Sequence, residues 1–206
     1  NTLQDEIIEA LVDEAVERDF IGWQFDFENI NHLDRDRYTD FIEKAYKEFQ
    51  KEDLLLSVAV VPGIADYDKN ALFQDWTGGY NVKDLANTVD FMTLMSYDDP
   101  RSQGPVAAID YVEKTIQQAK KDKVPGNKIS LGVPFYCWQY ELGNSKKIAS
   151  VQYDVSANTM TKYKEYGVGS LYLKAWEAEI FVFNKPGVGL NYIWCDNVES
   201  FKAKKD

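Results

Sequence analysis

The run Leu54-Leu55-Leu56-Ser57-Val58-Ala59-Val60-Val61 decides the fold class of this chain. Only Ser57 interrupts its apolar side chains, and Pro62-Gly63 follows directly. A strand with one face in water alternates polar and apolar residues, whereas a strand covered on both faces does not. We therefore expect a strand of a parallel sheet here, ended by the proline, which cannot donate to a sheet ladder.

Helical and strand patterns alternate on either side of this run. Apolar residues at a spacing of three to four predict helices, and Thr2 with Asp5 resembles the capping box that begins one. The expected elements are, in chain order, a helix over 3–15, a strand over 20–27, a helix over 38–49, the strand over 54–61, a helix over 80–87, a strand over 89–96, a helix over 106–122 and a strand over 129–135. Helices between strands imply parallel strands joined by crossover connections, so the predicted class is α/β.

Beyond Tyr140 the pattern becomes less regular. The expected elements are short strands over 151–153 and 171–176, a helix near 156–166, a hairpin of 180–183 with 192–194, and a last helix over 198–204. The chain contains no internal repeat, low-complexity tract or linker, so one domain is the simplest interpretation.

Composition narrows the possible partners. The 206 residues include 34 acidic and 23 basic side chains, which give a net charge of −11. Nucleic acid or an anionic membrane would be bound against net repulsion, and no apolar stretch approaches the roughly 20 residues that span a bilayer. Aromatic residues make up 14% of the chain, with five Trp and thirteen Tyr. An acidic, aromatic-rich protein favours a neutral ligand that stacks on rings, such as a sugar.

The cysteines carry little information. Cys137 and Cys195 form neither a metal-site spacing nor a C-x-x-C motif, and His32 is the only histidine. We interpret them as two unpaired, partly buried thiols.

The stretch Gly22-Trp23-Gln24-Phe25-Asp26-Phe27-Glu28-Asn29 is the most informative for chemistry. On a strand, Gln24, Asp26 and Glu28 share one face. An edge strand with a solvated polar face would explain the pattern, but a place within a βαβ series predicts that both faces are covered. Two neighbouring buried carboxylates are costly unless they have a function, and a carboxylic acid that stays protonated can act as a general acid. Glu28 at the carboxyl end of the strand is where parallel α/β folds place catalysis.

Two further strands end in residues that could bind a ligand. Met95-Ser96-Tyr97-Asp98 brings a tyrosine hydroxyl and a carboxylate to a strand end, although a plain polar loop explains it equally well. Pro134-Phe135-Tyr136-Cys137-Trp138 ends the strand expected over 129–135. Tyr136 and Trp138, past that strand end, are the better candidates for a sugar-stacking platform, whereas core packing explains Phe135 as well as stacking would.

Together these strand ends resemble glycoside hydrolase family eighteen, the chitinase-like (β/α)₈ barrels. Residues 22–28 resemble the family's D-G-x-D-x-D-x-E strand, Met95–Asp98 its M-x-Y-D strand, and Leu131–Tyr136 its G-[IV]-P-x-Y strand. Gly104–Ala107 and Ile193–Phe201 resemble the subgroup of YaaH-type spore-cortex hydrolases. The resemblance covers nearly the whole chain in the right order.

The resemblance implies a retaining hydrolase whose substrate supplies the nucleophile. It implies that Glu28 protonates the leaving oxygen, that Asp26 orients the 2-acetamido group, and that Tyr97 hydrogen-bonds the acetamido oxygen. It implies that Asp98 binds the sugar nearby, and we add Gln24, Met95, Tyr136 and Trp138 as candidates for the substrate-binding set. The implied substrate is a β-1,4-linked N-acetylglucosamine polymer of the chitin, peptidoglycan or N-glycan-core type, with no metal or cofactor, and the expected location is secreted or in the cell envelope.

The chain departs from the family pattern in sequence and in length. Ile21 and Gln24 stand where the motif has its first two aspartates. By alignment the chain carries barrel strands four to seven, with residues 139–195 as a small α+β insertion, whereas strands one to three and eight have no counterpart. A closed barrel has roughly 250 residues. We therefore expect residues 1–206 to be a partial TIM-barrel segment, and the missing remainder of the barrel is a possible partner.

Two other interpretations stay open. A catalytically silent, carbohydrate-binding relative is favoured by Gln24 and by the absence of the last-strand tryptophan, while the presence of Glu28 favours the enzyme. An unrelated acidic α/β domain with chance motif matches would be supported if Asp26 and Glu28 pointed into solvent.

Overall fold

The structure, a computed structural model, describes residues 2–61, 63–64, 73–99, 103–144 and 147–205. Pro62, expected to end a strand, lies outside the described residues. Internal contacts divide the chain into two compact units. The first unit comprises residues 1–95 and 114–132, and the second unit comprises residues 96–113 and 133–206.

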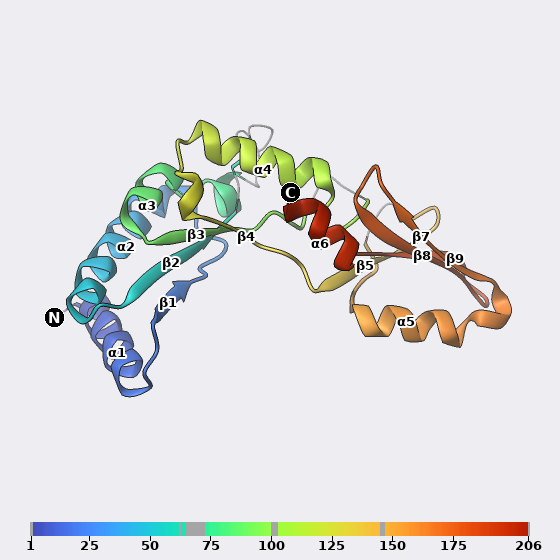
Figure 1. Ribbon diagram of the computed structural model, residues 1–206, viewed down its shortest axis with the longest axis horizontal. Helices are drawn as coiled ribbons and strands as arrows, with labels where there is room; N and C mark the ends of the chain where they lie inside the picture. The colour runs from blue at the N-terminus through green and yellow to red at the C-terminus, as the bar shows by residue number, and fades with distance from the viewer. Residues whose placement is uncertain (1, 62, 65–72, 100–102, 145–146, 206) are drawn as a thin grey trace. The chain divides into compact units, whose positions relative to one another are not determined.

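The first unit is built on a parallel sheet (Figure 1). Its helices and strands are, in chain order, α1 (Leu3–Glu17), β1 (Gly22–Phe25), α2 (Arg35–Phe49), β2 (Leu55–Val60), α3 (Val82–Thr88), β3 (Phe91–Leu94), most of α4 (Ile109–Lys121) and β4 (Ile129–Leu131), with short 3₁₀ or π turns at His32–Asp34, Gln50–Glu52, Phe73–Thr77 and Gly126–Lys128. The described strands pair in the order β1-β2-β3-β4, and every pair is parallel. The predicted α/β alternation is thus confirmed, with shorter strands than expected.

The first helix begins as the sequence predicts. The Asp5 backbone N–H donates to the Thr2 hydroxyl at 3.4 Å, and the Thr2 backbone N–H donates to the Asp5 carboxylate at 2.7 Å. This reciprocal capping box satisfies two of the N–H groups that a helix start leaves unpaired.

One face of β1 packs against α1 and α2. The Trp23 indole N–H donates to the Leu11 carbonyl oxygen of α1 at 2.8 Å. The ring of Phe25 stacks on Phe41 of α2 with centroids 5.6 Å apart and meets Phe49 edge-on at 6.1 Å. A buried phenylalanine contributes about 1.5–3 kcal/mol by leaving water, so this packing fixes the orientation of β1. Alternation along the strand then turns Gln24 to the opposite face.

The second unit is built on an antiparallel sheet. Its helices and strands are β5 (Tyr136–Glu141), β6 (Ala149–Gln152), α5 (Tyr153–Lys162), a 3₁₀ turn (Lys164–Tyr166), β7 (Val168–Leu173), β8 (Ala178–Lys185), β9 (Gly189–Cys195) and α6 (Val198–Lys205). The described strands pair in the order β6-β5-β9-β8-β7. The predicted hairpin is β8–β9, where Gly187 takes a φ of +77° that glycine adopts without strain.

Tyr136 and Trp138 lie past the end of β4, as the sequence predicts, but they belong to a further strand that the sequence did not predict. They begin β5, which pairs with β6 on one side and β9 on the other. Trp138 and Tyr140 therefore face the same side of a central strand, and Trp138 is 5% exposed within a cluster that includes Val106 and Trp194. The alternation of aromatic residues over 136–141 is the sequence signal for this strand.

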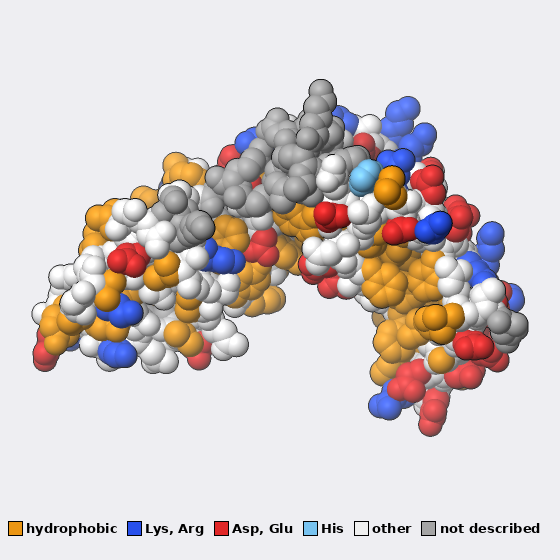
Figure 2. Space-filling model, turned by 180° about the vertical axis from the view of Figure 1, so that it is seen from behind, with side chains coloured by type: hydrophobic (Ala, Val, Ile, Leu, Met, Phe, Trp, Pro, Cys, Tyr) orange, Lys and Arg blue, Asp and Glu red, His pale blue; other side chains and the backbone are white. Residues whose placement is uncertain are grey.

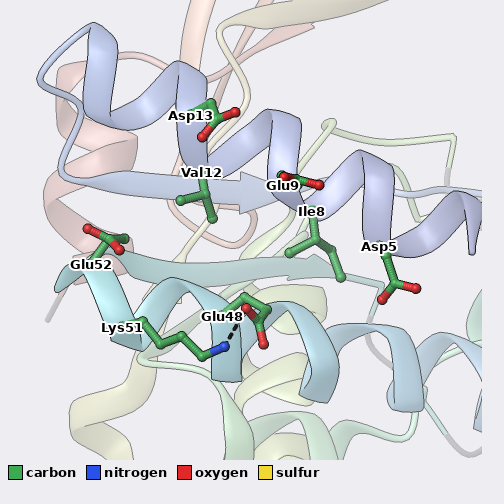
Figure 3. Close-up of a pocket in the computed structure, with 8 residues that line it drawn as sticks. All are labelled: Asp5, Ile8, Glu9, Val12, Asp13, Glu48, Lys51 and Glu52. Atoms are coloured by element: carbon green, nitrogen blue, oxygen red, sulfur yellow. Dashed lines mark hydrogen bonds and ion pairs between the residues drawn. The ribbon is translucent and has the colours of Figure 1, made fainter. Parts of the chain in front are cut away.

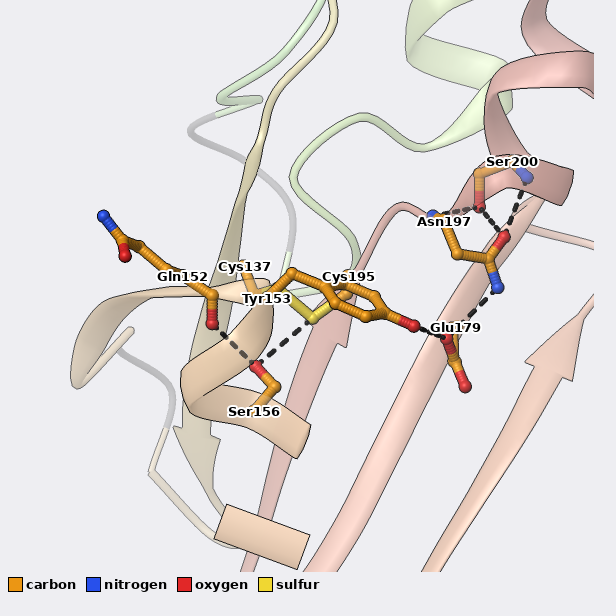
Figure 4. Close-up of a disulfide and its surroundings, with 8 residues drawn as sticks. All are labelled: Cys137, Gln152, Tyr153, Ser156, Glu179, Cys195, Asn197 and Ser200. Atoms are coloured by element: carbon orange, nitrogen blue, oxygen red, sulfur yellow. Dashed lines mark hydrogen bonds between the residues drawn. A yellow bond between two sulfur atoms is a disulfide. The ribbon is translucent and has the colours of Figure 1, made fainter. Parts of the chain in front are cut away.

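The cysteines are also not the free thiols that the sequence suggested. Cys137 and Cys195 form a disulfide, with their Cα atoms 4.5 Å apart. The cause is the register of β5 and β9, which pairs Trp138 with Trp194 and so places the two cysteines opposite one another. Figure 4 shows the Ser156 hydroxyl of α5 beside this disulfide, donating to the Gln152 carbonyl oxygen at 3.3 Å. The pairing spans 58 residues, which no local sequence pattern reveals.

Apolar side chains lie at the surface of both units among charged ones (Figure 2). Strongly exposed examples are Leu3, Ile21 and Leu33 in the first unit and Phe135, Leu142 and Val198 in the second. Of the two interpretations of Phe135, core packing is excluded, because its side chain lies largely in solvent and meets Phe201 edge-on at 5.7 Å. None of the described helices is both long and apolar enough to cross a membrane.

Candidate active site

Asp26 and Glu28 lie in the turn that follows β1, because the strand ends at Phe25. Both side chains are exposed, so the expected burial of these carboxylates is wrong for the described structure. The turn continues through Asn29, whose φ of +56° is a left-handed conformation that asparagine tolerates. The two carboxylates follow the carboxyl end of a parallel strand, the end that the sequence predicts.

The residue between them is anchored. The Phe27 ring stacks on Phe41 of α2 at 6.1 Å and on Phe25 at 5.8 Å. The Tyr80 hydroxyl donates to the Phe27 carbonyl oxygen at 2.7 Å. The backbone of the turn is therefore held while the flanking carboxylates stay open to solvent.

Gln24 joins three strands on the face opposite Trp23. Its Oε1 accepts from the Ser57 hydroxyl of β2 at 3.3 Å and from the Thr93 hydroxyl of β3 at 3.0 Å. Because the oxygen has two donors, the amide nitrogen is the end of Gln24 that can donate to a ligand. Ser57 and Thr93 are functional candidates that only the structure reveals, although each is the polar exception within its strand.

Asp98 and Tyr136 form a hydrogen-bonded pair in the second unit. The Tyr136 hydroxyl donates to Asp98 Oδ2 at 2.5 Å. Asp98 has a φ of +61°, and its backbone N–H donates to the Val106 carbonyl oxygen at 2.8 Å. The Tyr97 ring meets the Tyr136 ring edge-on at 6.5 Å. Asp98 Oδ1 is buried with no hydrogen-bond partner among the described residues, so it has an acceptor to offer a ligand.

Met95 and Trp138 are less accessible than the resemblance implies. Met95 is 6% exposed, and its backbone N–H donates to the Val60 carbonyl oxygen, which extends the β2–β3 ladder. Trp138 is packed under Lys147, whose ammonium lies 4.7 Å from the ring centroid. The Trp138 indole N–H has no partner in the described part of the chain. Neither side chain presents an open surface for stacking.

The predicted residues thus form two sets. Gln24, Asp26 and Glu28 belong to β1 and its turn in the first unit, while Tyr97, Asp98 and Tyr136 cluster in the second. Tyr80 was missed, although Gly78-Gly79 before it signals a close approach of backbones.

Two cavities of the described structure lie apart from Asp26 and Glu28, which line neither of them. A groove of about 340 Å³ runs between α1 and α2, lined largely by carboxylates such as Glu9, Asp13 and Glu48 (Figure 3). An apolar pocket of about 240 Å³ in the second unit includes Tyr136, Phe135 and Phe201. Among the described residues, no group of three or more His, Cys, Asp or Glu side chains could hold a metal ion.

Comparison with known proteins identifies the family. The model for glycosyl hydrolases family 18 matches residues 1–205. The Bacillus subtilis protein YdhD is 25% identical over an alignment of 210 positions that covers 98% of this chain and 47% of YdhD. The YdhD crystal structure superposes with a TM-score of 0.84 at 22% identity, covering 98% of this chain and 66% of that one.

Two cortex-lytic proteins are similar over the same extent. The cortical fragment-lytic enzyme of Bacillus anthracis is 26% identical over 98% of this chain and 46% of its own length. The spore cortex-lytic enzyme SleL of Bacillus megaterium QM B1551 has a TM-score of 0.80 at 25% identity, covering 98% of this chain and 46% of SleL. The chain therefore spans less than half the length of these curated relatives.

These matches also decide two earlier expectations. The fold is α/β of the TIM-barrel type. An unrelated acidic domain with chance motif matches is excluded, even though Asp26 and Glu28 are exposed. The chain belongs to glycosyl hydrolases family 18.

Proposed function

We propose that this chain is the catalytic segment of a retaining glycoside hydrolase that cleaves β-1,4-linked N-acetylglucosamine polymers. The observation that carries the proposal is the pair Asp26 and Glu28 at the carboxyl end of a parallel strand in a chain of this family. The exposure of both carboxylates supports it too, because a polymer must reach them.

Glu28 carries the proton transfers in this proposal. It donates a proton to the glycosidic oxygen while the substrate's 2-acetamido oxygen attacks the anomeric carbon and the leaving sugar departs. The resulting oxazolinium ring is opened by water, whose proton returns to Glu28, so the configuration is retained. Asp26 orients the acetamido N–H and balances the positive charge of the ring. Gln24 contributes an amide donor beside them, since its oxygen is occupied by Ser57 and Thr93.

The second unit supplies the proposed sugar contacts. Tyr97 donates to the acetamido oxygen, and Asp98 accepts from a sugar hydroxyl through Oδ1, which has no described partner. Tyr136 fixes Asp98 through its short hydrogen bond to Oδ2. Met95 and Trp138 each act by packing within their own unit, because both are buried.

The domain organisation is part of the proposal. We assign the four parallel strands to barrel strands four to seven and residues 139–195 to an α+β insertion. The order β1-β2-β3-β4 supports this, since β1 and β4 each have a neighbour on one side only among the described strands. Exposed strand edges need covering, which the remainder of a barrel would provide. Disulfides such as Cys137–Cys195 persist in oxidising compartments and so support a secreted or cell-envelope location.

Hydrolysis of chromogenic chitobiose and chitotriose substrates tests the function. Glu28→Gln keeps the shape but has no proton to donate, so we expect kcat to fall by about 10²–10⁴-fold. Glu9→Gln, an exposed change on α1, is the matched control and should retain activity. Equal activity of Glu28→Gln and wild type would contradict the assigned acid. Peptidoglycan fragments in a parallel assay distinguish the polymer classes.

A second candidate is a carbohydrate-binding protein without catalysis. Gln24 favours it, because an amide at this position cannot share a proton with Asp26 as a carboxylate would. Calorimetric binding of N-acetylglucosamine oligomers, with turnover in neither wild type nor Glu28→Gln, would support this alternative.

A further inference from the structure

Tyr80 makes a hydrogen bond at the centre of the proposed catalytic turn. The residue lies two positions before α3, is 5% exposed, and donates through its hydroxyl to the Phe27 carbonyl oxygen at 2.7 Å. That carbonyl belongs to the peptide group that joins Phe27 to Glu28. A fixed carbonyl restricts rotation of this peptide plane, and therefore restricts the direction in which the Glu28 backbone leaves it.

The segment that carries Tyr80 is pressed against the same turn at a second point. A Cβ atom on Gly79 would lie 2.5 Å from both the Cβ and the carbonyl oxygen of Ile30. Real Cβ atoms do not approach so closely, so this backbone contact requires glycine. Further along, the Asn31 side-chain amide donates to the Asp75 carboxylate at 2.7 Å. Contacts from residues 75–80 therefore hold the turn from Phe27 to Asn31.

Tyr38 of α2 provides an internal comparison for Tyr80. The two rings meet edge-on at 6.0 Å, and Tyr38 is 7% exposed. Its ring packs on Phe27 at 5.9 Å, but its hydroxyl has no hydrogen-bond partner in the described part of the chain. The two tyrosines thus share burial and ring contacts and differ in what the hydroxyl does.

The Tyr80 hydroxyl remains a donor at any working pH. Burial, followed by the nearby charges of Tyr38, Glu28 and Asp26, raises the pKa of Tyr80 well above the usual tyrosine value. The hydroxyl therefore keeps its proton. A protonated hydroxyl beside a carbonyl is a stable arrangement rather than a switch.

We propose that Tyr80 is a positioning residue that aims the general acid Glu28 by holding the Phe27 carbonyl, an inference that rests on the function proposed above. Tyr80 does not touch substrate in this arrangement. Its hydroxyl acts through the turn, and Gly79 permits the approach that brings it there.

The matched variants Tyr80→Phe and Tyr38→Phe separate this role from general packing. Each removes one hydroxyl and keeps the ring. We expect the ¹⁵N order parameters of Phe27, Glu28 and Asn29 to fall from the rigid range of about 0.85 toward the flexible range below about 0.6 in Tyr80→Phe only. Unchanged order parameters in Tyr80→Phe, or equal losses in both variants, would overturn the proposal.

Kinetics supply the second readout. A neutral hydrogen bond contributes about 1 kcal/mol, so Tyr80→Phe should lower kcat by about five- to tenfold and change KM by no more than about twofold. Tyr38→Phe should change neither kcat nor KM by more than about twofold. A change in KM alone would contradict positioning of the acid. If the wild type binds but hydrolyses nothing, the proposed function fails, and the order parameters still decide whether Tyr80 holds the turn.

A backbone variant covers the case in which Tyr80→Phe unfolds. Gly79→Ala should displace the turn and reduce kcat as Tyr80→Phe does, because its Cβ would collide with Ile30. Gly126→Ala is the control, since its Cβ would meet nothing within 4 Å. Equal kcat values for the two alanine variants would overturn the inference.

Discussion

The two compact units stabilise their sheets by different means. In the first unit, β1 is held by ring packing, with Phe25 stacked on Phe41 and edge-on to Phe49 of the neighbouring helix. In the second unit, a disulfide links two strands, and a buried ion pair joins Asp196 after β9 to Lys204 of α6. The first unit therefore relies mainly on apolar packing, whereas the second adds a covalent link and a buried charge pair.

The two units also differ in how far their candidate site residues are exposed to solvent. Asp26 and Glu28 stand on an exposed turn whose backbone is anchored by buried neighbours. Asp98 is instead partly enclosed, with one oxygen bonded to Tyr136 and the other buried without a described partner. Proton transfer to a polymer requires an accessible acid, while selective binding of a sugar hydroxyl benefits from a desolvated acceptor.

The largest expected effect is loss of the buried ion pair. Lys204 Nζ lies 2.5 Å from Asp196 Oδ1, and the two side chains are 1% and 0% exposed. Burial raises the pKa of Asp196 and lowers that of Lys204, while each partner's charge opposes the shift of the other. Lys204→Ala leaves a buried carboxylate alone and should lower the free energy of unfolding by about 3–5 kcal/mol, measured by urea denaturation.

Two variants sharpen that result. Lys202→Ala, an exposed change on the same helix, should stay within about 0.5 kcal/mol of wild type. Replacing both partners, Asp196→Leu with Lys204→Met, should recover most of the loss because no isolated charge remains. A double variant as unstable as Lys204→Ala would show that the pair is not acting through its charges.

The disulfide should have the next largest effect. Cys137→Ala with Cys195→Ala opens a link between residues 58 apart in sequence and should lower the free energy of unfolding by about 2–4 kcal/mol. Amide hydrogen exchange should accelerate in β5 and β9 and remain near wild-type rates in β1 and β2. A reducing agent should destabilise the wild type but leave the double variant unchanged. Faster exchange in β1 and β2 as well would contradict the assignment of this link to the second unit alone.

The elements that the sequence predicted best are those with local signals. The sequence predicts the helix capped by Thr2 and the strand over 54–61 because periodicity and capping depend on residues that are close together in the chain. The strand β5 was missed because its aromatic residues were assigned to a binding surface, although Tyr136, Trp138 and Tyr140 alternate as a strand requires. The Cys137–Cys195 pairing depends on a register between distant strands and has no local signature.

The candidate site divides in the same way. The motif resemblance placed Asp26 and Glu28 at a strand end, and the structure has them in the turn just after β1. It could not reveal that Gln24 accepts from Ser57 and Thr93, since that contact requires three strands in register. The sequence predicts buried carboxylates because the βαβ order suggests that both faces of β1 are covered. That order does not say how many strands or helices lie next to β1, so the prediction was wrong.

The smallest expected effect comes from removing the exposed ion pair between Asp5 and Lys44. Hydrogen bonds from the Lys44 ammonium, and then from Thr2, hold the pKa of the Asp5 carboxyl well below its usual value of about 3.9. A carboxyl whose pKa is lower in the folded chain contributes stability above the ordinary pKa and loses it as the pH falls. Asp5→Asn should therefore lower the unfolding temperature at pH 6 and make less difference at pH 2.5.

The control for this pH dependence lies on the same helix. Asp13 lines the same groove as Asp5 but is not part of the cap (Figure 3). Asp13→Asn should change the unfolding temperature by nearly the same amount at pH 6 and pH 2.5, because the contacts of Asp5 with Thr2 and Lys44 remain in place. An Asp5→Asn effect that grows on acidification would mean that the carboxylate does not stabilise the start of α1. Asparagine keeps a side-chain oxygen that can accept from the Thr2 backbone N–H, so the change in unfolding temperature reports mainly the negative charge of Asp5 and its interaction with Lys44, the largest cause of the lowered pKa.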